Sequence, residues 1–384
     1  MQFEFATATS IIFGAGTFSK IGQLTAEFGR RACIVSGLSG QTNQSLGETF
    51  NKSSVATIIY PIIGEPTIET IQNGVKEAKQ YEAEVVIGLG GGSALDSAKA
   101  IAAMLTNPGE LTNYVEVVGQ DRSLTTPPVP IIAIPTTAGT GSEVTRNAVI
   151  GVPESAIKVS LRSPLMLPCL ALIDPELTYN LPRELTASTG LDALTQLIEP
   201  FVCNNPNPIT DGMCREGMNR SARMLLRAYR NGQDTDARQE LCIASLLGGL
   251  ALANARLGAV HGLAGALGGM LPIPHGAICA RLLPLVMEIN LRALEARLPD
   301  STYIARYREV ARIITGDSRA NAIDGVQWVR EQCATLHVQP LGNLGLRRSH
   351  FSDLIDKAFH ASSMKGKPIP LMPDEVLEIL ERAL

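Results

Sequence analysis

Residues 84–102 read EVVIGLGGGSALDSAKAIA, and this stretch decides the fold class. It opens as a short β-branched apolar run, continues through three glycines at 90–92, and ends with the apolar spacing of a helix. Consecutive glycines let the chain turn sharply and leave backbone N–H groups accessible. A strand that enters a helix through such a turn is typical of a parallel sheet covered by helices.

The same pattern extends on both sides of this stretch. Short apolar runs predict buried strands at 31–36, 56–63, 84–89 and 129–134, and helical spacing predicts helices at 67–80 and 94–105. Strands alternating with helices imply right-handed crossovers and a mostly parallel sheet. A further block of strand character covers 147–173. We therefore expect an α/β, Rossmann-like N-terminal domain.

The composition and the hydrophobic periodicity of the sequence change beyond Pro182. From 183 to the end it is rich in Ala, Leu, Arg and Glu with 3.6-residue periodicity, which predicts an all-helical domain. The expected domains are therefore 1–182 and 183–384. Helix interruptions are expected at the prolines numbered 200, 206, 208, 272, 274, 284 and 340.

Composition excludes several functional classes. The 384-residue chain has a net charge of −4 and only 4% aromatic residues, which argues against nucleic acid and anionic membranes as partners. Its seven cysteines form no CxxC pair, so a reduced, cytoplasmic protein is expected. The N-terminus lacks the pattern of a signal peptide, and no apolar stretch reaches the roughly 18 residues of a membrane span.

Two polar loops follow buried strands and predict a nucleotide site. Gly90, Gly91, Gly92 and Ser93 would present N–H groups and a helix N-terminus to an anion such as a pyrophosphate. The segment PTTAGTGSE at 135–143 places hydroxyls at the end of another strand. Each loop alone could be an ordinary turn. Together, at the carboxyl edge of one parallel sheet, they favour nucleotide binding.

The helical half contains a candidate metal site. Asp192 and Gln196 are four residues apart and so share a helix face. His261 and His275 lie in glycine-rich surroundings farther along the chain. An Asp with two His would suit Fe²⁺ or Zn²⁺ and leave coordination positions free. Their spacing alone equally allows buried structural histidines.

Taken together, these motifs resemble those of the iron-containing (group III) alcohol dehydrogenases over essentially the whole chain. The resemblance rests on these motifs: FGAG at 13–16, GLGGGSALDSAKAIA at 88–102, IPTTAGTGSEVT at 134–145, IDPELTYNLP at 173–182, GLDALTQLIEPFV at 190–202, VHGLAGALGG at 260–269 and PHG at 274–276. It implies the dehydroquinate synthase-like fold of that family, with NAD(P) in the cleft between an α/β and a helical domain.

The resemblance also assigns residues and an activity. The activity is hydride transfer between NAD(P) and an alcohol or aldehyde (or ketone), with a divalent metal, Fe²⁺ or Zn²⁺, as Lewis acid. The metal ligands would be Asp192, Gln196, His261 and His275, of which Asp192, His261 and His275 would also serve catalysis. The cofactor would contact Gly90, Gly91, Gly92, Ser93, Asp96, Thr136, Thr137, Thr140 and Lys158.

The sequence departs from the family pattern at two positions. Gln196 stands where the family usually has His, and a neutral amide is a poorer ligand for a transition metal. Gly265 stands where the family often has a further His. Three alternatives therefore stay open: a metal-independent oxo-acid reductase of the maleylacetate reductase type, a lyase-like relative of dehydroquinate synthase, and an inactive nucleotide-binding relative.

The sequence also bears on the choice between NAD and NADP and on the oligomeric state. The segment SGLSG at 36–40 has no acid to hold a ribose 2′-hydroxyl, and Ser39 could donate to a 2′-phosphate, so NADP is favoured over NAD. Related proteins are often dimers through an N-terminal strand, so a homodimer is expected. Its candidate surface comprises Phe3, Phe5 and 11–13.

Overall fold

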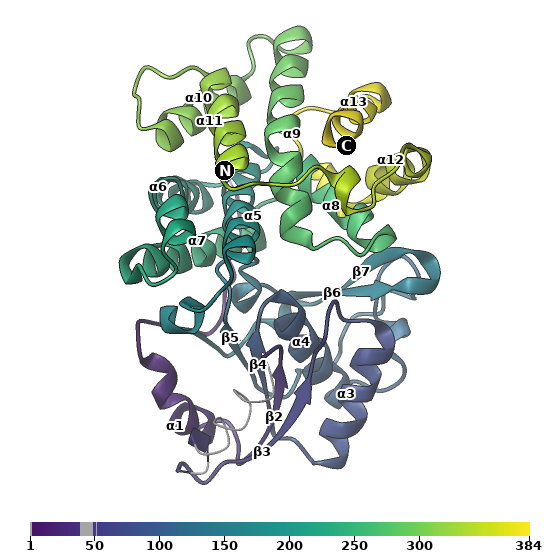
Figure 1. The fold of residues 1–384 in the computed structure, drawn as a ribbon. Helices are drawn as coiled ribbons and strands as arrows, with labels where there is room; N and C mark the ends of the chain where they lie inside the picture. Colours follow the sequence, from purple (N-terminus) through teal and green to yellow (C-terminus); the bar gives the residue numbers. More distant parts are fainter. Residues whose placement is uncertain (1, 39–48, 51) are drawn as a thin grey trace. The chain divides into compact units, whose positions relative to one another are not determined.

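A computed structural model describes residues 2–38, 49–50 and 52–384 and confirms the expected fold class. The described chain forms two compact units. An α/β unit contains residues 6–137 and 141–179, and a helical unit contains 180–384 together with the short segments 2–5 and 138–140. Figure 1 shows the sheet in purple and blue and the helices of the second unit in teal to yellow.

The centre of the α/β unit is a six-stranded sheet in the order β1-β8-β5-β4-β2-β3. All of its neighbouring strands are parallel. The strands are β1 (Ser10–Phe13), β2 (Arg31–Ser36), β3 (Ala56–Pro61), β4 (Val85–Gly90), β5 (Ile131–Pro135) and β8 (Leu170–Ile173). The centrally placed β4 carries the glycine-rich turn at its carboxyl end.

Both faces of this sheet are buried, as near-continuous apolar strands require. In β2, Ala32 and Ile34 belong to one hydrophobic cluster, whereas Cys33 and Val35 belong to another on the opposite face. The second cluster includes Ile101 of α4 (Gly92–Thr106), and α4 also packs on α3 (Ile68–Gln80). Burial on both faces therefore fixes β2 and β4 and, with them, the turn between β4 and α4.

The segment expected to have strand character at 147–173 forms three strands. Two of them, β6 (Asn147–Val152) and β7 (Ile157–Arg162), pair as an antiparallel hairpin outside the main sheet, and the third is β8. The hairpin packs against α4 through β6. Ala148 and Ile150 point from β6 into the cluster that also contains Ile101.

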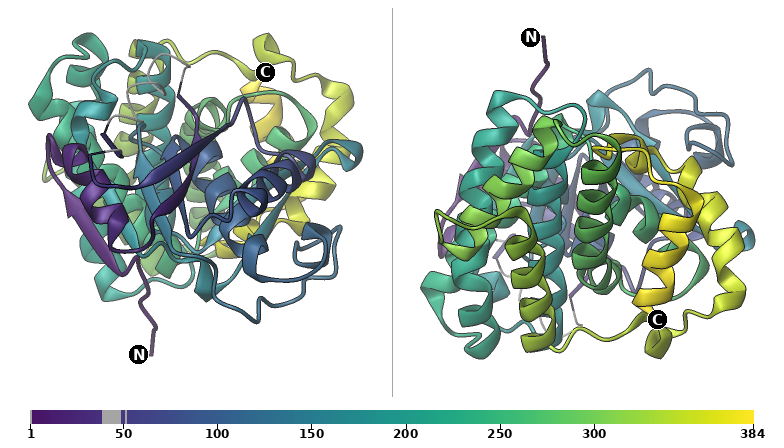
Figure 2. Two further views of the ribbon diagram at one scale, coloured as in Figure 1. Left: turned by 90° about the horizontal axis from the view of Figure 1, so that it is seen from below. Right: turned by 90° about the horizontal axis from the view of Figure 1, so that it is seen from above.

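The helical unit consists of long helices that pack side by side, as the view from above in Figure 2 shows for α6 and α7. The helices are α5 (Arg183–Val202), α6 (Pro208–Arg230), α7 (Thr235–Asn254), α8 (Ala259–Met270), α9 (His275–Arg297), α10 (Thr302–Thr315), α11 (Ala322–Thr335), α12 (Phe351–His360) and α13 (Pro373–Ala383). Among the described residues no single helix is long and apolar enough to cross a membrane, although α7 and α8, bent by 94°, meet the length and apolarity criteria together.

Proline starts some of these helices and does not end others. Pro208 is the first residue of α6, and Pro274 directly precedes α9. The expected interruptions at Pro200 and Pro284 are wrong, because α5 and α9 continue through them. A proline inside a helix removes one hydrogen bond at a cost of about 3 kcal/mol. Both prolines are buried, and packing on several neighbouring helices offsets that cost.

Candidate functional site

One face of α5 carries the polar residues of the candidate metal site. Asp192, Gln196 and Glu199 follow one another at i, i+4 and i+7, and all three are buried. Most other residues of α5 between 186 and 202 are buried as well, so the helix lies within the unit rather than on its surface. Buried carboxylates require partners, and these come from two other helices.

Glu199 connects α5 to the beginning of α8. Its Oε1 accepts a hydrogen bond from the backbone N–H of Val260 (2.7 Å), and its Oε2 accepts one from His261 Nδ1 (2.7 Å). The residue before α8 is Gly258, where a Cβ atom would lie 2.6 Å from Glu199 Oε1. The glycine thus admits a carboxylate that caps α8, neutralises its positive end and fixes the ring of His261.

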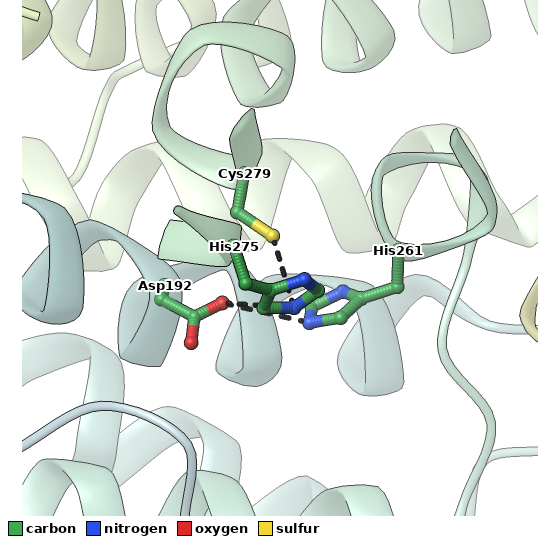
Figure 3. Close-up of side chains that lie close together, drawn as sticks. All are labelled: Asp192, His261, His275 and Cys279. Carbon is green, nitrogen blue, oxygen red and sulfur yellow. Dashed lines mark hydrogen bonds and ion pairs between the residues drawn. The ribbon is translucent and has the colours of Figure 1, made fainter. Parts of the chain in front are cut away.

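His275 and Cys279 come from the first two turns of α9. They are four residues apart, and Cys279 Sγ lies 3.5 Å from His275 Nε2. Asp192 Oδ1 lies 3.7 Å from His261 Nε2 and 3.8 Å from His275 Nε2. Figure 3 shows the four side chains of Asp192, His261, His275 and Cys279 pointing toward one another. Their potential ligand atoms all lie within 4.8 Å of one another.

The polar atoms at the centre of this cluster are those that a metal ion would satisfy. Asp192 Oδ1, His261 Nε2 and Gln196 Oε1 are buried and have no hydrogen-bond partner within the described part of the chain. Leaving such atoms unpaired costs about 1–3 kcal/mol each. Carboxylate oxygen, imidazole nitrogen and thiolate sulfur are all ligands of divalent transition metals. The donor set therefore fits the divalent metal that the sequence motifs predict.

Electrostatics favour the charged forms of the acid and of one imidazole. Burial raises the pKa of Asp192, but its contact with His261 and the charge of His275 outweigh this, so its pKa lies below the ordinary value. Burial lowers the pKa of His261, but the flanking carboxylates of Asp192 and Glu199 raise it to about 9. Asp192 is thus an anion at neutral pH and available to a cation.

The structure brings together Asp192, His261 and His275, and it places Gln196 beside them. Gln196 Nε2 donates a hydrogen bond to Asp192 Oδ2 (3.2 Å), so the amide contacts the carboxylate. Sequence reasoning missed Glu199 and Cys279. Two signals pointed to them: Glu199 continues the Asp192–Gln196 face by one turn, and Cys279 follows His275 at i+4.

The glycine-rich turn adopts a conformation that suits an anion site. Gly90 has φ +152°, which a residue with a side chain rarely adopts, and a Cβ atom there would lie 2.8 Å from Ala94 Cβ. Gly91 precedes α4 without a capping side chain, so the first N–H groups of this 15-residue helix need another acceptor. Gly92 and Ser93 form the first turn of α4.

Asp96 and Lys99 belong to an internal network behind that turn. Asp96 accepts hydrogen bonds from Ser142 Oγ (2.5 Å) and Val149 N (2.9 Å), and it pairs with the fully buried Lys99 (3.0 Å). Lys99 also donates to Ser142 Oγ (2.7 Å) and to Thr145 Oγ1 (3.0 Å). The two side chains therefore connect α4 to the loop at 142–145 and to β6.

The other predicted cofactor residues lie in different places. Thr136 is buried, and its N–H donates to the carbonyl of Gly90 (2.9 Å). The side chain of Thr137 lies next to the glycine turn, 3.5 Å from where a Cβ of Gly91 would be. Thr140 belongs to the segment 138–140 of the helical unit. Lys158, on β7, pairs with Glu65 at 3.2 Å, and Ser39 lies outside the described residues.

Comparison with known proteins matches both parts of the chain to one protein family. Residues 8–175 match the family described as iron-containing alcohol dehydrogenase, and residues 186–384 match the C-terminal domain of the Fe-containing alcohol dehydrogenase family. Alcohol dehydrogenase 4 of Saccharomyces cerevisiae is 36% identical over 348 residues, which cover 90% of this chain and 87% of the yeast protein.

Solved structures show the same fold. A 1,3-propanediol oxidoreductase superposes with a TM-score of 0.91 at 28% identity over 100% of both chains. A sulfoacetaldehyde reductase from Bifidobacterium kashiwanohense, solved in complex with NAD⁺, gives a TM-score of 0.86 at 25% identity, covering 99% of this chain and 98% of that one. The likeness therefore extends over both units.

Proposed function

Since the chain belongs to the iron-containing alcohol dehydrogenase family and is accordingly an alcohol oxidoreductase, we propose that it transfers hydride reversibly between an alcohol and NAD(P) with the help of one divalent metal ion. The observation that carries the metal half of this proposal is the cluster of buried, unpartnered donor atoms, Asp192 Oδ1 and His261 Nε2, beside His275.

When bound, the metal supplies a Lewis acid for the substrate oxygen, and the nicotinamide accepts or returns the hydride. Asp192, His261 and His275 would hold the ion. Glu199 accepts a hydrogen bond from His261 Nδ1 and so directs Nε2 toward the ion, which would displace the Nε2 proton on binding. Gln196 orients the Asp192 carboxylate through its amide. The side chains of the protein thus prepare the charge and the direction of the ligand atoms.

The cofactor half of the proposal rests on the turn between β4 and α4. We place the pyrophosphate at Gly90, Gly91, Gly92 and Ser93, with Thr136 and Thr137 beside it. The helix N-terminus offers N–H donors and a partial positive charge to the phosphates. Asp96 would act indirectly, by holding the loop at 142–145 against α4. Thr140 and Lys158 are proposed to contact the rest of the cofactor.

Between the two nicotinamide cofactors we propose NADP. The described residues at the end of β2, Ser36, Gly37 and Leu38, offer no carboxylate to hold a ribose 2′-hydroxyl or to repel a 2′-phosphate. The comparison is kcat/KM for one alcohol with NADP⁺ and with NAD⁺. A higher value with NAD⁺ would contradict the proposal.

We also propose a homodimer in the cytoplasm. β1 is an edge strand with β8 on one side, and edge strands have backbone groups available for pairing with a second chain. None of the seven cysteines, all within the described residues, forms a disulfide, which suits a reducing compartment. Light scattering should give the mass of two chains, and cell fractionation should recover the enzyme with the cytoplasmic fraction. A one-chain mass or a different compartment would contradict these two points.

The direct test of function is turnover on a panel of primary alcohols, aldehydes and oxo-acids with both cofactors. Gly265 faces open space, since a Cβ there would meet nothing within 4 Å, so the panel should include bulky as well as short substrates. We expect alcohol and aldehyde turnover that Asp192→Asn reduces at least a hundredfold. Turnover of oxo-acids alone, insensitive to that substitution, would instead indicate a metal-independent reductase. Cofactor binding without any turnover would indicate an inactive relative.

A further inference from the structure

Cys279 is a member of the donor cluster that the sequence motifs did not predict. It is buried, one helical turn from His275, and its Sγ lies within the same 4.8 Å group as the donor atoms of Asp192, His261 and His275. Gln196, which the motifs place fourth, donates through its amide nitrogen to Asp192 Oδ2, and its Oε1 is buried without a hydrogen-bond partner within the described residues. The structure thus adds a sulfur atom to the donor cluster, beside the amide that the motifs predict.

Sulfur changes the chemistry of the site. A thiolate is a soft, anionic ligand, whereas an amide oxygen is neutral and hard. Asp192 and a Cys279 thiolate together would carry two negative charges against the two positive charges of the ion. Among the common divalent metals, a set of one carboxylate, two imidazoles and one thiolate suits zinc, which binds oxygen, nitrogen and sulfur in tetrahedral geometry.

The two other atoms aimed into this cluster provide an independent indication of a ligand. Asp192 Oδ1 and His261 Nε2 are buried and have no hydrogen-bond partner within the described residues. They belong to helices α5 and α8, whereas His275 and Cys279 belong to α9. Donor atoms from three separate helices therefore converge on one point, and a cation there would satisfy the unpartnered atoms of α5 and α8.

We propose that Cys279 Sγ is the fourth metal ligand, in place of Gln196, and that the resulting Asp192–His261–His275–Cys279 set selects zinc over iron. The inference rests on the metal dependence in the proposed function. Binding would exchange the thiol proton for the ion and release that proton to solvent. Some catalytic zinc sites expand to five-coordinate, and substrate would bind here as such a fifth ligand. Gln196 is then a positioning residue that orients Asp192.

The test uses the full-length protein, stripped of metal and loaded with one Co²⁺ per chain. A cysteine ligand gives a sulfur-to-cobalt charge-transfer band in the near ultraviolet, which oxygen and nitrogen ligands do not. We expect the band in the native chain and in Gln196→Ala. We expect Cys279→Ala to lose it and to bind zinc more than about 100-fold more weakly, beyond the usual effect of an indirect contact. The matched control is Cys214→Ala, which removes a buried cysteine of α6 and should keep the band.

A second measurement needs no variant. Zinc-edge X-ray absorption of the zinc-loaded native chain should show one sulfur at about 2.3 Å in addition to nitrogen and oxygen at about 2.0–2.2 Å. One bound ion without a charge-transfer band or a sulfur neighbour would overturn the role of Cys279 and leave the metal-dependent function standing. Failure to bind either ion would overturn both.

The choice between zinc and iron is tested by competition. Gln196→His/Cys279→Ala should take up a larger share of Fe²⁺ against Zn²⁺ than the native chain, and an unchanged share would contradict the selection of zinc.

Discussion

Glu199→Gln tests whether this carboxylate organises the metal site. Glu199 accepts from Val260 N through one oxygen and from His261 Nδ1 through the other, each at 2.7 Å. Glutamine keeps the shape but has only one acceptor atom, so its NH₂ group must face one of these two donors. The two orientations of the amide lead to different results, a loss of stability in one case and a loss of metal affinity in the other.

If His261 keeps its tautomer, the variant loses one hydrogen bond to a charged group. The expected loss in the free energy of unfolding is about 2–3 kcal/mol for the metal-free protein. If His261 instead loses its Nδ1 proton and keeps the one on Nε2, Nδ1 can accept from the amide and stability is largely kept. Metal binding at Nε2 then requires the remaining proton to move to Nδ1, which faces the amide NH₂ group, so metal affinity should fall about 10–100-fold.

The assays are denaturant unfolding of the metal-free chain and zinc affinity by competition with a chelator. Glu309→Gln is the matched control, because Glu309 forms an exposed ion pair with Arg215 and should change stability by less than about 1 kcal/mol. The reasoning is refuted if Glu199→Gln changes zinc affinity less than twofold and stability by less than about 0.5 kcal/mol.

Three further substitutions test the α/β unit. Gly90→Ala places a Cβ 2.8 Å from Ala94 Cβ in a backbone with φ +152°, and this should lower the free energy of unfolding by about 1–3 kcal/mol. It should also weaken NADP⁺ binding at least tenfold, as measured by calorimetry. Unaltered affinity would exclude the turn from the cofactor site. Asp96→Asn leaves the fully buried Lys99 without its carboxylate partner and should lower the free energy of unfolding by about 3–5 kcal/mol. The double variant Asp96→Asn/Lys99→Met should regain part of that stability. A double variant as unstable as Asp96→Asn would refute this. Burial raises the pKa of Glu143 from 4.5 to about 7, so the folded chain binds more protons than the unfolded chain between these values, and stability should fall by about 3 kcal/mol as pH rises from 4.5 through 7. Glu143→Gln should remove that fall in thermal unfolding curves, and an unchanged pH dependence would contradict the assignment.

The sequence predicted the α/β unit well because its signals are local. The run RACIVS forms β2 at 31–36, and the helix expected at 94–105 forms as α4 from Gly92 to Thr106. Buried parallel strands are continuously apolar, and glycines mark where such a strand turns into a helix. The interruptions predicted at Pro200 and Pro284 do not occur, because packing in the helical unit outweighs a local helix-breaking preference.

The candidate metal site was only partly predictable. The motifs placed Asp192, His261 and His275 in one site, and these side chains do converge. Which neighbours face them depends on the packing of α5, α8 and α9, which no local spacing specifies. Cys279 and Glu199 therefore emerge only from the three-dimensional arrangement, although both lie on the correct helix faces.

The most direct test of metal-dependent hydride transfer is metal removal and return with turnover as the readout. The untagged protein is analysed for bound metal, depleted with a chelator, assayed with an alcohol and NADP⁺, and then reloaded with zinc or iron. We expect about one ion per chain, loss of turnover on depletion with NADP⁺ affinity retained, and recovery on reloading. Full turnover by the depleted chain would contradict it.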